Sequence, residues 1–237
     1  AALKKYFGWQ DGDEIIVCVC GFPTTINPII QNNLKPVFVD ISYDDLNWDL
    51  DQVKDKITTR TKAVFSSPVL GNPYDYDKLL DICETYNIKL IADNCDSLGS
   101  KWKNEYLTKH AVASSCSFYP AHHITMGEGG YVATNDANQD VILRSFREWG
   151  RGCYCVGPEA NKLKCGTCGK RFNEWIPELK GEVFDHKFVY DEIGFNLKPI
   201  ESQCAMGMKQ IDKLPEIHAL RRRNYKLLFD IYSKYEQ

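Results

Sequence analysis

The sequence predicts an α/β fold in which a mostly parallel sheet is flanked by helices. Short, continuous apolar runs alternate with segments of helical periodicity along most of the 237 residues. Such runs are typical of strands that are buried on both faces of a parallel sheet and connected by helices. The chain is 43% hydrophobic and 26% charged, so it has enough apolar surface for a core, and wholesale disorder is excluded.

The expected strands are apolar runs bounded by polar or turn-forming residues. They are residues 14–19, 36–40, 62–66, 88–93, 113–118 and 131–134. The expected helices lie between or after these runs, at residues 24–32, 50–56, 75–86 and 137–149. This alternation predicts βαβ units, and therefore parallel neighbours in the sheet.

The last third of the chain departs from this alternation. Residues 150–181 carry four Cys and two Pro with little periodicity, which is typical of a functional excursion from a compact domain. Residues 201–235 are helical in pattern, with Pro215 as a kink or boundary. We therefore expect residues 1–200 to form a large α/β domain and residues 201–237 to form a helical connection.

Charge and composition exclude several classes of protein. The net charge is −3 and the charges are scattered, so a broad basic surface for nucleic acid is not expected. No stretch approaches the roughly 20 apolar residues that a membrane helix needs. No secretion signal accompanies the ten Cys, which favours reduced thiols and a cytoplasmic location. The chain begins without Met and ends inside a helical run, so we expect an internal fragment of a longer protein.

Polar side chains mark where the ligand site should lie. Asp40, Asp93, Ser66 and Ser117 all fall at the ends of expected strands. Ligands of open α/β sheets bind at the carboxyl ends of the strands. The sequence therefore predicts a cleft at this edge of the sheet.

The segment Asp93-Asn94-Cys95-Asp96 places two carboxylates and a thiol just past a strand. One interpretation is structural, because an Asp in this position often only caps a helix. The other is functional, in acid–base chemistry or in pairing with a protonated ring nitrogen. The segment by itself favours neither.

His122 and His123 lie between an expected strand and the turn Gly127-Glu128-Gly129-Gly130. Adjacent side chains point in different directions, so at most one imidazole should serve a given site. The glycines allow positive φ and a close approach of the backbone to a ligand. A metal site on the two histidines is disfavoured, because no further ligands stand at a suitable spacing.

Four cysteines form two closely spaced pairs, Cys153 with Cys155 and Cys165 with Cys168. Spacing alone favours a zinc knuckle, because paired thiolates suit tetrahedral zinc. An iron–sulfur site is the alternative, although neither of the common ferredoxin spacings is present.

Taken together, these motifs resemble one family. Residues 117–130 read SFYPAHHITMGEGG, which is similar to the signature segment of the DegT/DnrJ/EryC1/StrS sugar aminotransferases. In that family the segment carries a Lys that forms a Schiff base with pyridoxal phosphate, and here His122 takes its place. The resemblance implies the type I fold of pyridoxal-phosphate-dependent transferases.

Three further segments, residues 21–28, 93–96 and 167–172, resemble a branch of this family, the 3-dehydrases of CDP-4-keto-6-deoxy-D-glucose. The similarity spans essentially the whole chain and implies that an N-terminal segment and a C-terminal small domain are missing. It also implies noncovalent pyridoxamine 5'-phosphate, a [2Fe–2S] cluster and removal of the C3 hydroxyl of a CDP-linked 4-keto-6-deoxyhexose. The route leads to the 3,6-dideoxyhexoses of lipopolysaccharide, with electrons from an NADH-dependent iron–sulfur flavoprotein reductase.

The resemblance also implies a role for individual residues of a homodimer. His122 would be the catalytic base, since an imidazole cannot form the Schiff base but can take a proton near neutral pH. Asp93 would pair with the pyridine nitrogen, Phe22 would stack on the ring, and Ser117 would bind the phosphate. Asn196 would bind the phosphate of the partner subunit. The implied cluster ligands are Cys95, Cys153, Cys155 and Cys168.

The sequence differs from the family pattern at two places. The stretch between Cys155 and Cys168 is longer than the usual loop, and residues 66–68 replace a segment that more often carries a His. Two rival functions stay open at this point. One is a lysine-less 3-dehydratase without a cluster, and the other is a non-catalytic relative with a structural zinc loop.

Overall fold

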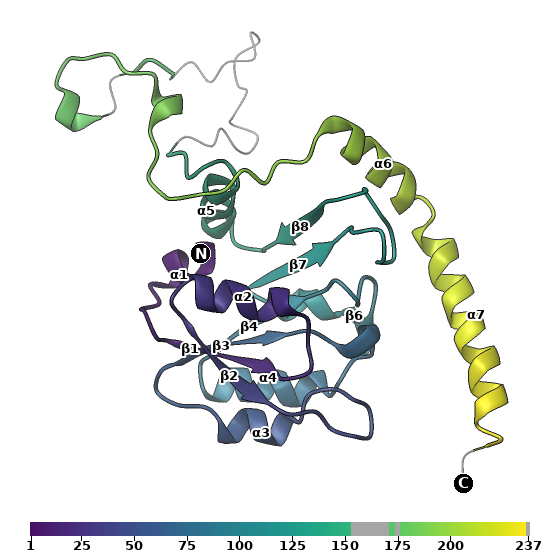
Figure 1. Ribbon diagram of the computed structural model, residues 1–237. Helices are drawn as coiled ribbons and strands as arrows, with labels where there is room; N and C mark the ends of the chain where they lie inside the picture. Colours follow the sequence, from purple (N-terminus) through teal and green to yellow (C-terminus); the bar gives the residue numbers. More distant parts are fainter. Residues whose placement is uncertain (153–170, 174–175, 236–237) are drawn as a thin grey trace.

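The computed structural model describes residues 1–152, 171–173 and 176–235, which form a mostly parallel sheet with helices on both faces (Figure 1). The main sheet has the strand order β2-β1-β3-β4-β7-β8. Its strands are β1 (Glu14–Cys18), β2 (Lys35–Val39), β3 (Thr61–Ser66), β4 (Lys89–Asp93), β7 (Ala113–Ser117) and β8 (Gly130–Ala133). All neighbours are parallel except β7 and β8, which are antiparallel. The predicted fold class is confirmed.

The helices are α1 (Ala2–Phe7), α2 (Pro23–Gln31), α3 (Leu50–Asp55), α4 (Tyr76–Thr85), α5 (Ala137–Arg147), α6 (Glu201–Ile211) and α7 (Leu214–Tyr232). Three of them begin after an Asp. Asp49, Asp75 and Asp136 each accept a hydrogen bond from a backbone N–H in the first turn of α3, α4 and α5. Such N-caps satisfy donors that the helix itself leaves unpaired.

The side chains of β1 explain why the sheet needs a helical layer on each face. Every residue of β1 is buried, and consecutive side chains of a strand point to opposite faces. Ile16 belongs to the apolar cluster that includes residues of α3 and α4. Ile15 and Val17 belong to the second cluster, with Ile29 of α2. Figure 1 shows α3 and α4 on one side of the sheet and α2 on the other.

The order of the strands brings the predicted site elements to one edge. β1 lies between β2 and β3. The chain therefore adds β2 on one side of β1 and then crosses over to add β3 on the other side. Ligands of α/β sheets bind at such switch points, beside the carboxyl ends of the strands. Phe22, Asp93 and Ser117 follow or end β1, β4 and β7 at this same edge.

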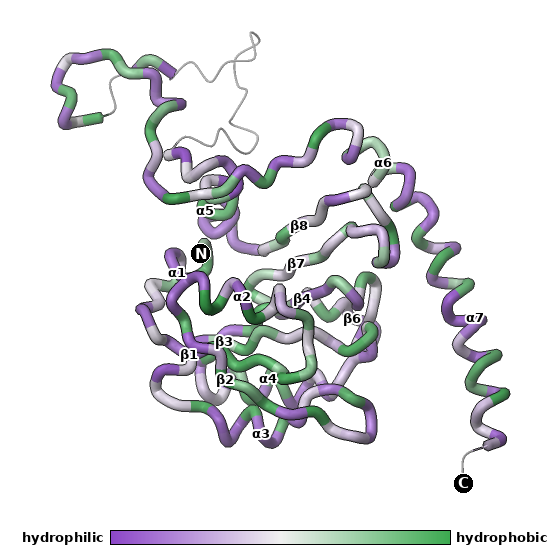
Figure 2. Tube along the Cα trace, viewed as in Figure 1, coloured by the Kyte–Doolittle hydropathy of each residue, from purple (hydrophilic) through white to green (hydrophobic). Residues whose placement is uncertain are grey.

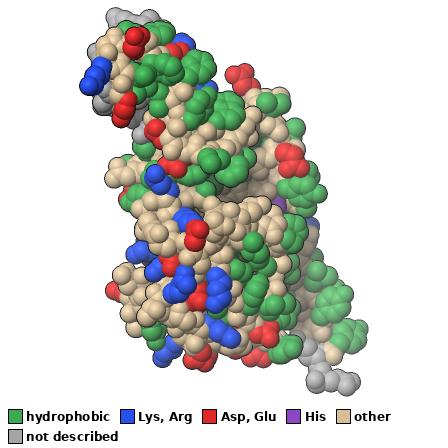
Figure 3. All heavy atoms as spheres, turned by 60° about the vertical axis from the view of Figure 1, so that its left-hand side comes forward, with side chains coloured by type: hydrophobic (Ala, Val, Ile, Leu, Met, Phe, Trp, Pro, Cys, Tyr) green, Lys and Arg blue, Asp and Glu red, His purple; other side chains and the backbone are tan. Residues whose placement is uncertain are grey.

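The helices α6 and α7 extend along the outside of the sheet domain (Figure 1). Neither has a buried residue, and apolar side chains such as Tyr225, Phe229 and Tyr232 are exposed. Figure 3 shows hydrophobic side chains at several places on the surface of the molecule. Figure 2 shows hydrophobic and hydrophilic residues alternating along α7. Within the described ranges, no helix combines the length and the apolar character that crossing a membrane requires.

The predicted elements agree with the structure to within one or two residues at most ends. The predicted boundary at Pro215 is confirmed, since α6 ends at Ile211 and α7 begins at Leu214. Helix α1 and the hairpin of β5 (Lys101–Trp102) and β6 (Glu105–Tyr106) were not predicted. The division into domains at residue 200 stays a prediction.

Candidate active site

Asp93 ends β4 and is the buried carboxylate of the site, with 9% of the residue exposed. Its Oδ1 accepts the backbone N–H of Cys95 at 3.1 Å, and its Oδ2 accepts the hydroxyl of Thr25 at 3.3 Å. No helix follows β4 directly, so the interpretation of Asp93 as a helix N-cap is wrong. Among the described residues it has no cationic partner.

Cys95 lies against the same carboxylate. Its thiol is half-buried and hydrogen-bonded to Asp93. Burial raises the pKa of this thiol above its usual range, and the hydrogen bond to Asp93 and its negative charge raise it further. On the neighbouring strand, burial raises the pKa of Cys116 to about 11. Both thiols therefore hold their protons at neutral pH unless a metal displaces them.

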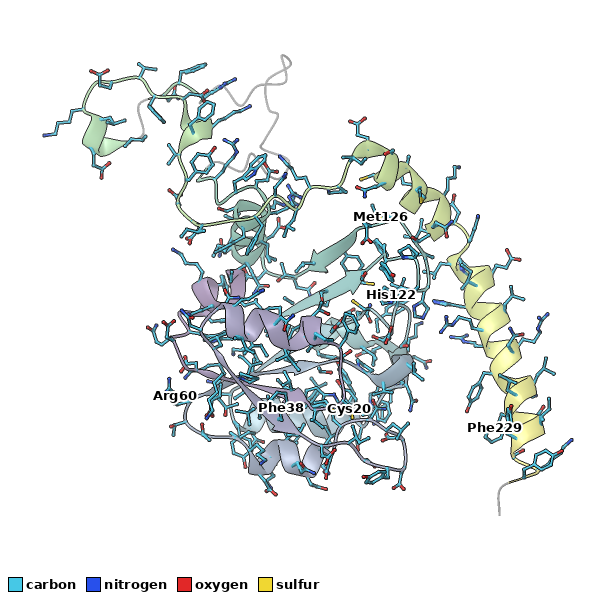
Figure 4. The ribbon with its side chains drawn as sticks, viewed as in Figure 1. Cys20, Phe38, Arg60, His122, Met126 and Phe229 are labelled. Carbon is cyan, nitrogen blue, oxygen red and sulfur yellow. The ribbon has the colours of Figure 1, made fainter. Side chains whose placement is uncertain are left out.

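His122 lies on the loop between β7 and β8, and Figure 4 shows it beside Met126 on that loop. The loop is closed by backbone hydrogen bonds, from Phe118 N to Gly129 O at 2.8 Å and from Met126 N to Phe118 O at 2.9 Å. The side chain of His122 is 21% exposed, and its Nδ1 lies 3.4 Å from Oδ1 of Asp96. Because Nδ1 faces this carboxylate, Nε2 points to the other side of the ring and is the nitrogen available to a ligand.

His123 packs against α7 and also lies near Asp96. Its ring contacts the ring of His218 on α7, with centroids 5.9 Å apart and planes at 87°. Burial lowers the pKa of His123, and the charges of Arg221 and His218 lower it further. The two imidazoles have different partners, and the expectation that at most one of them serves the site stays a prediction.

The glycines after the loop are required by geometry at two positions. Gly127 has φ +79°, a conformation that L side chains rarely adopt. At Gly130 a Cβ would lie 2.5 Å from the backbone oxygen of Cys116 on the paired strand. The turn therefore holds β8 against β7 closely enough to fix the loop that carries His122.

Phe22 follows β1 and Ser117 ends β7, so both lie at the same edge of the sheet as Asp93. Phe22 is the N-cap of α2 and is 71% exposed, so its ring is free to stack on a planar ligand. The hydroxyl of Ser117 accepts the backbone N–H of Tyr119 at 3.1 Å and keeps its own proton to donate.

Asn196 is described, but the chain does not bring it to this edge. Asn196 forms an isolated bridge with Glu148, just after α5, so its predicted role in the partner subunit stays a prediction. Cys153, Cys155 and Cys168, and with them Cys165, lie outside the described residues. In the part of the chain that is described, no group of three or more His, Cys, Asp or Glu side chains could hold a metal ion.

Sequence reasoning gave no role to two residues of the site, Thr25 and Asp96. The contact of Thr25 with Asp93 spans 68 positions of the sequence, and no local pattern encodes it. The sequence marks Asp96 only as a second carboxylate, and its place just past a strand end is the signal for a site residue.

The donor set fits pyridoxamine 5'-phosphate. A buried carboxylate without a cationic partner is costly, and a protonated pyridine nitrogen would supply the missing charge. An exposed aromatic ring, a strand-end hydroxyl and an imidazole lie around the same edge of the sheet. They correspond to the ring, the phosphate and the amine-bearing carbon of that cofactor.

Comparison with known proteins identifies the family. The DegT/DnrJ/EryC1/StrS aminotransferase family matches residues 1–235, and the chain belongs to this family. The chain is 41% identical over 219 residues to the lipopolysaccharide biosynthesis protein RfbH of Salmonella typhimurium, covering 92% of this chain and 49% of that protein. It is 40% identical to a dTDP-4-dehydro-2,6-dideoxy-D-glucose 3-dehydratase of Saccharopolyspora spinosa, covering 92% and 46%.

Solved structures support the same placement. A His-to-Asn variant of GDP-4-keto-6-deoxymannose-3-dehydratase with bound GDP-perosamine superposes with a TM-score of 0.82 at 31% identity, covering 98% of this chain and 57% of that chain. The enzyme of that name from E. coli, with bound hydrated PLP, gives a TM-score of 0.80 at 30% identity, covering 94% and 54%. These neighbours confirm the predicted type I fold. The chain spans about half the length of the curated relatives it matches.

Proposed function

We propose that this chain is the cofactor-binding part of a 3-dehydrase that removes the C3 hydroxyl of a CDP-linked 4-keto-6-deoxyhexose. The observation that carries the proposal is the buried Asp93 carboxylate, which has no cationic partner among the described residues, at the same sheet edge as a loop that offers an imidazole, His122, in place of the family's Lys. The names of the relatives as sugar 3-dehydratases support the reaction. Their nucleotides are dTDP and GDP, so the choice of CDP rests on the sequence motifs.

Each residue of the site has a defined task in this reaction. When bound, pyridoxamine 5'-phosphate would supply an electron-withdrawing pyridine ring. Asp93 keeps the pyridine nitrogen protonated, Phe22 holds the ring, and Ser117 binds the phosphate. His122 takes a proton through Nε2 from the amine-bearing carbon, while Asp96 faces Nδ1 at 3.4 Å.

Replacing the C3 hydroxyl by hydrogen is a two-electron reduction, and a [2Fe–2S] cluster supplies electrons one at a time. Cys95, Cys153, Cys155 and Cys168 are the proposed ligands. Cys95 fits this role, because its backbone N–H donates to the carboxylate that would hold the cofactor. An NADH-dependent iron–sulfur flavoprotein reductase would provide the electrons, and a homodimer would complete each site with Asn196 from the partner subunit.

The decisive variant is His122→Asn in the full-length protein. We expect it to bind pyridoxamine 5'-phosphate as tightly as the wild type and to lose deoxygenation by at least about 100-fold, the contribution of a general base. The measurements are the dissociation constant of the cofactor and turnover of the CDP-linked 4-keto sugar with the reductase. His110→Asn is the control, because this exposed imidazole lies apart from the loop, beside Glu105. Near-normal turnover of His122→Asn would refute the assignment.

A further inference from the structure

Thr25 has no task in the function proposed above, yet it is in direct contact with the site. It is buried, with 6% of the residue exposed, and its hydroxyl donates to Oδ2 of Asp93 at 3.3 Å. A hydroxyl that donates to a carboxylate makes a charge-assisted hydrogen bond, and this one is longer than the usual length of about 2.5 to 3.0 Å for O–H···O bonds.

The two hydrogen bonds to Asp93 act on different oxygens. The backbone N–H of Cys95 donates to Oδ1 at 3.1 Å, and Thr25 donates to Oδ2. The terminal torsion of an Asp side chain is otherwise broad, so these two donors together fix the plane of the carboxylate. Each oxygen can accept more than one hydrogen bond, so the carboxylate keeps acceptor capacity for a ligand.

The start of α2 places Thr25 and Phe22 together. Pro23 is the first residue of the helix, and the backbone N–H of Thr25 donates to the carbonyl of Phe22 at 3.0 Å. Residues three apart lie on the same side of a helical turn. One turn therefore presents an exposed ring and a buried hydroxyl, while the next residue back, Thr24, is exposed.

We propose that Thr25 is a positioning residue that orients the carboxylate of Asp93 toward the pyridine nitrogen of bound pyridoxamine 5'-phosphate. Thr25 acts through Asp93 and does not itself contact the cofactor. This inference rests on the proposed function, and it deepens it by adding the first turn of α2 to the recognition of the ring nitrogen.

The test compares Thr25→Val, which keeps the shape and removes the donor, with Thr25→Ser, which keeps the donor. Thr24→Val is the matched control. The first measurement is the dissociation constant of pyridoxamine 5'-phosphate for each full-length protein. We expect Thr25→Val to weaken binding about tenfold, the scale of one hydrogen bond to a charged group. Thr25→Ser and Thr24→Val should bind as the wild type does.

The second measurement is the ¹⁵N chemical shift of the ring nitrogen in labelled cofactor at saturation. In Thr25→Val it should move toward the value of an unprotonated pyridine, whereas Thr25→Ser should restore the wild-type value. A role of Thr25 in packing alone would lower the stability of the cofactor-free protein and leave this shift unchanged. If Thr25→Val does not fold, Thr25→Ala removes the same hydroxyl and carries the same expectation.

The outcomes separate the two proposals. A wild-type protein that does not bind pyridoxamine 5'-phosphate would overturn the proposed function and this inference together. Cofactor binding by the wild type, with an unchanged affinity and ¹⁵N shift in Thr25→Val, would overturn the role of Thr25 alone.

Discussion

Cys95 connects the two parts of the proposed active site, the cofactor site at Asp93 and the [2Fe–2S] cluster. Its backbone N–H and its thiol both contact the carboxylate of Asp93. A metal ligand must give up its proton, and the raised pKa of Cys95 opposes this step until a metal binds. A cluster held here would lie next to the residue that holds the cofactor ring, which suits electron transfer. A local zinc knuckle of Cys153, Cys155, Cys165 and Cys168 would not use Cys95.

Substitution of single cysteines distinguishes the two metal sites. We expect the full-length protein, purified without oxygen, to contain about two irons per chain. Cys95→Ser should lose most of the iron and the visible absorption of the cluster, whereas Cys165→Ser should keep them. Cys20→Ser is the control, since Cys20 is an exposed cysteine outside both sets. One zinc per chain, kept in Cys95→Ser and lost in Cys165→Ser, would contradict the iron–sulfur assignment.

At the scale of elements, α6 and α7 are seated on the loops that form the site. A Cβ at Gly207 of α6 would lie 2.8 Å from Cγ of Met126, on the loop that carries His122. A Cβ at Gly99, just after Cys95 and Asp96, would lie 2.3 Å from Cε1 of His218 on α7. Close approach of this kind needs glycine, so the two helices are positioned against the loops at two separate points.

The packing of His123 against α7 should make the folding stability of the chain depend on pH. His123 faces His218 and Arg221 of α7, Asp96 from the loop after β4, and His122 of its own loop. The pKa of His123 is lowered in the folded chain. As the pH falls below about 6.5, the ordinary pKa of a histidine, the unfolded chain therefore binds more protons than the folded chain does. The stability that His123 contributes is therefore present above that value and is lost as the pH falls through the lowered pKa.

This expectation can be measured by urea unfolding. From about pH 7.5 to about pH 5.5 the unfolding midpoint of the wild type should fall more than that of His123→Gln, in which the titrating group is absent. His110→Gln should keep the dependence of the wild type. Equal pH dependence in the wild type and His123→Gln would show that the contact with α7 does not control this titration.

The elements that were predictable from the sequence are those with local signals. Buried strands such as β1 and β3 show as continuous apolar runs, and α3 and α4 start at an Asp. The direction of β8 was not predictable, because it depends on a turn that folds back onto β7 without a crossover helix. The hairpin of β5 and β6 was missed because its turn residues, Lys103 and Asn104, have positive φ without any glycine to mark them.

The site was predictable at the scale of the whole molecule only in part. Asp93, Ser117 and Phe22 could be placed because the carboxyl ends of parallel strands share one edge. The partners of Asp93 and His122 could not be placed, because Thr25 and Asp96 reach them through contacts between distant segments. The proposed task of Asn196 would depend on a second chain, which spacing within one chain cannot reveal.

Large apolar side chains are exposed in two regions of this surface. Phe22, Leu70, Ile193 and Leu197 are each more than half exposed. Phe22 and Leu70 follow strands at the edge that holds the site, whereas Ile193 and Leu197 belong to the segment around Asn196. Clusters of large exposed apolar residues mark interaction sites, and twofold dimers are the commonest assembly. A dimer that joins these two regions would bring Asn196 to the partner's site.

Complementation between two inactive variants tests this arrangement. In the proposed dimer, Asn196→Ala would impair phosphate binding in the partner's site, and His122→Asn would remove the base from its own site. In a mixed dimer, one site would combine an intact His122 with an intact Asn196 from the other chain. Random exchange of subunits should therefore restore about a quarter of the wild-type activity, because half of the dimers are mixed and each has one working site.

The control mixes His122→Asn with Asp93→Ala, a pair that would restore activity equally if these two residues came from different chains. We expect no more than additive residual activity from that pair. Both residues lie at the sheet edge of the same chain, so each site of a mixed dimer would still carry one of the two substitutions. Full activity in a monomer, or no recovery with Asn196→Ala, would contradict the shared site.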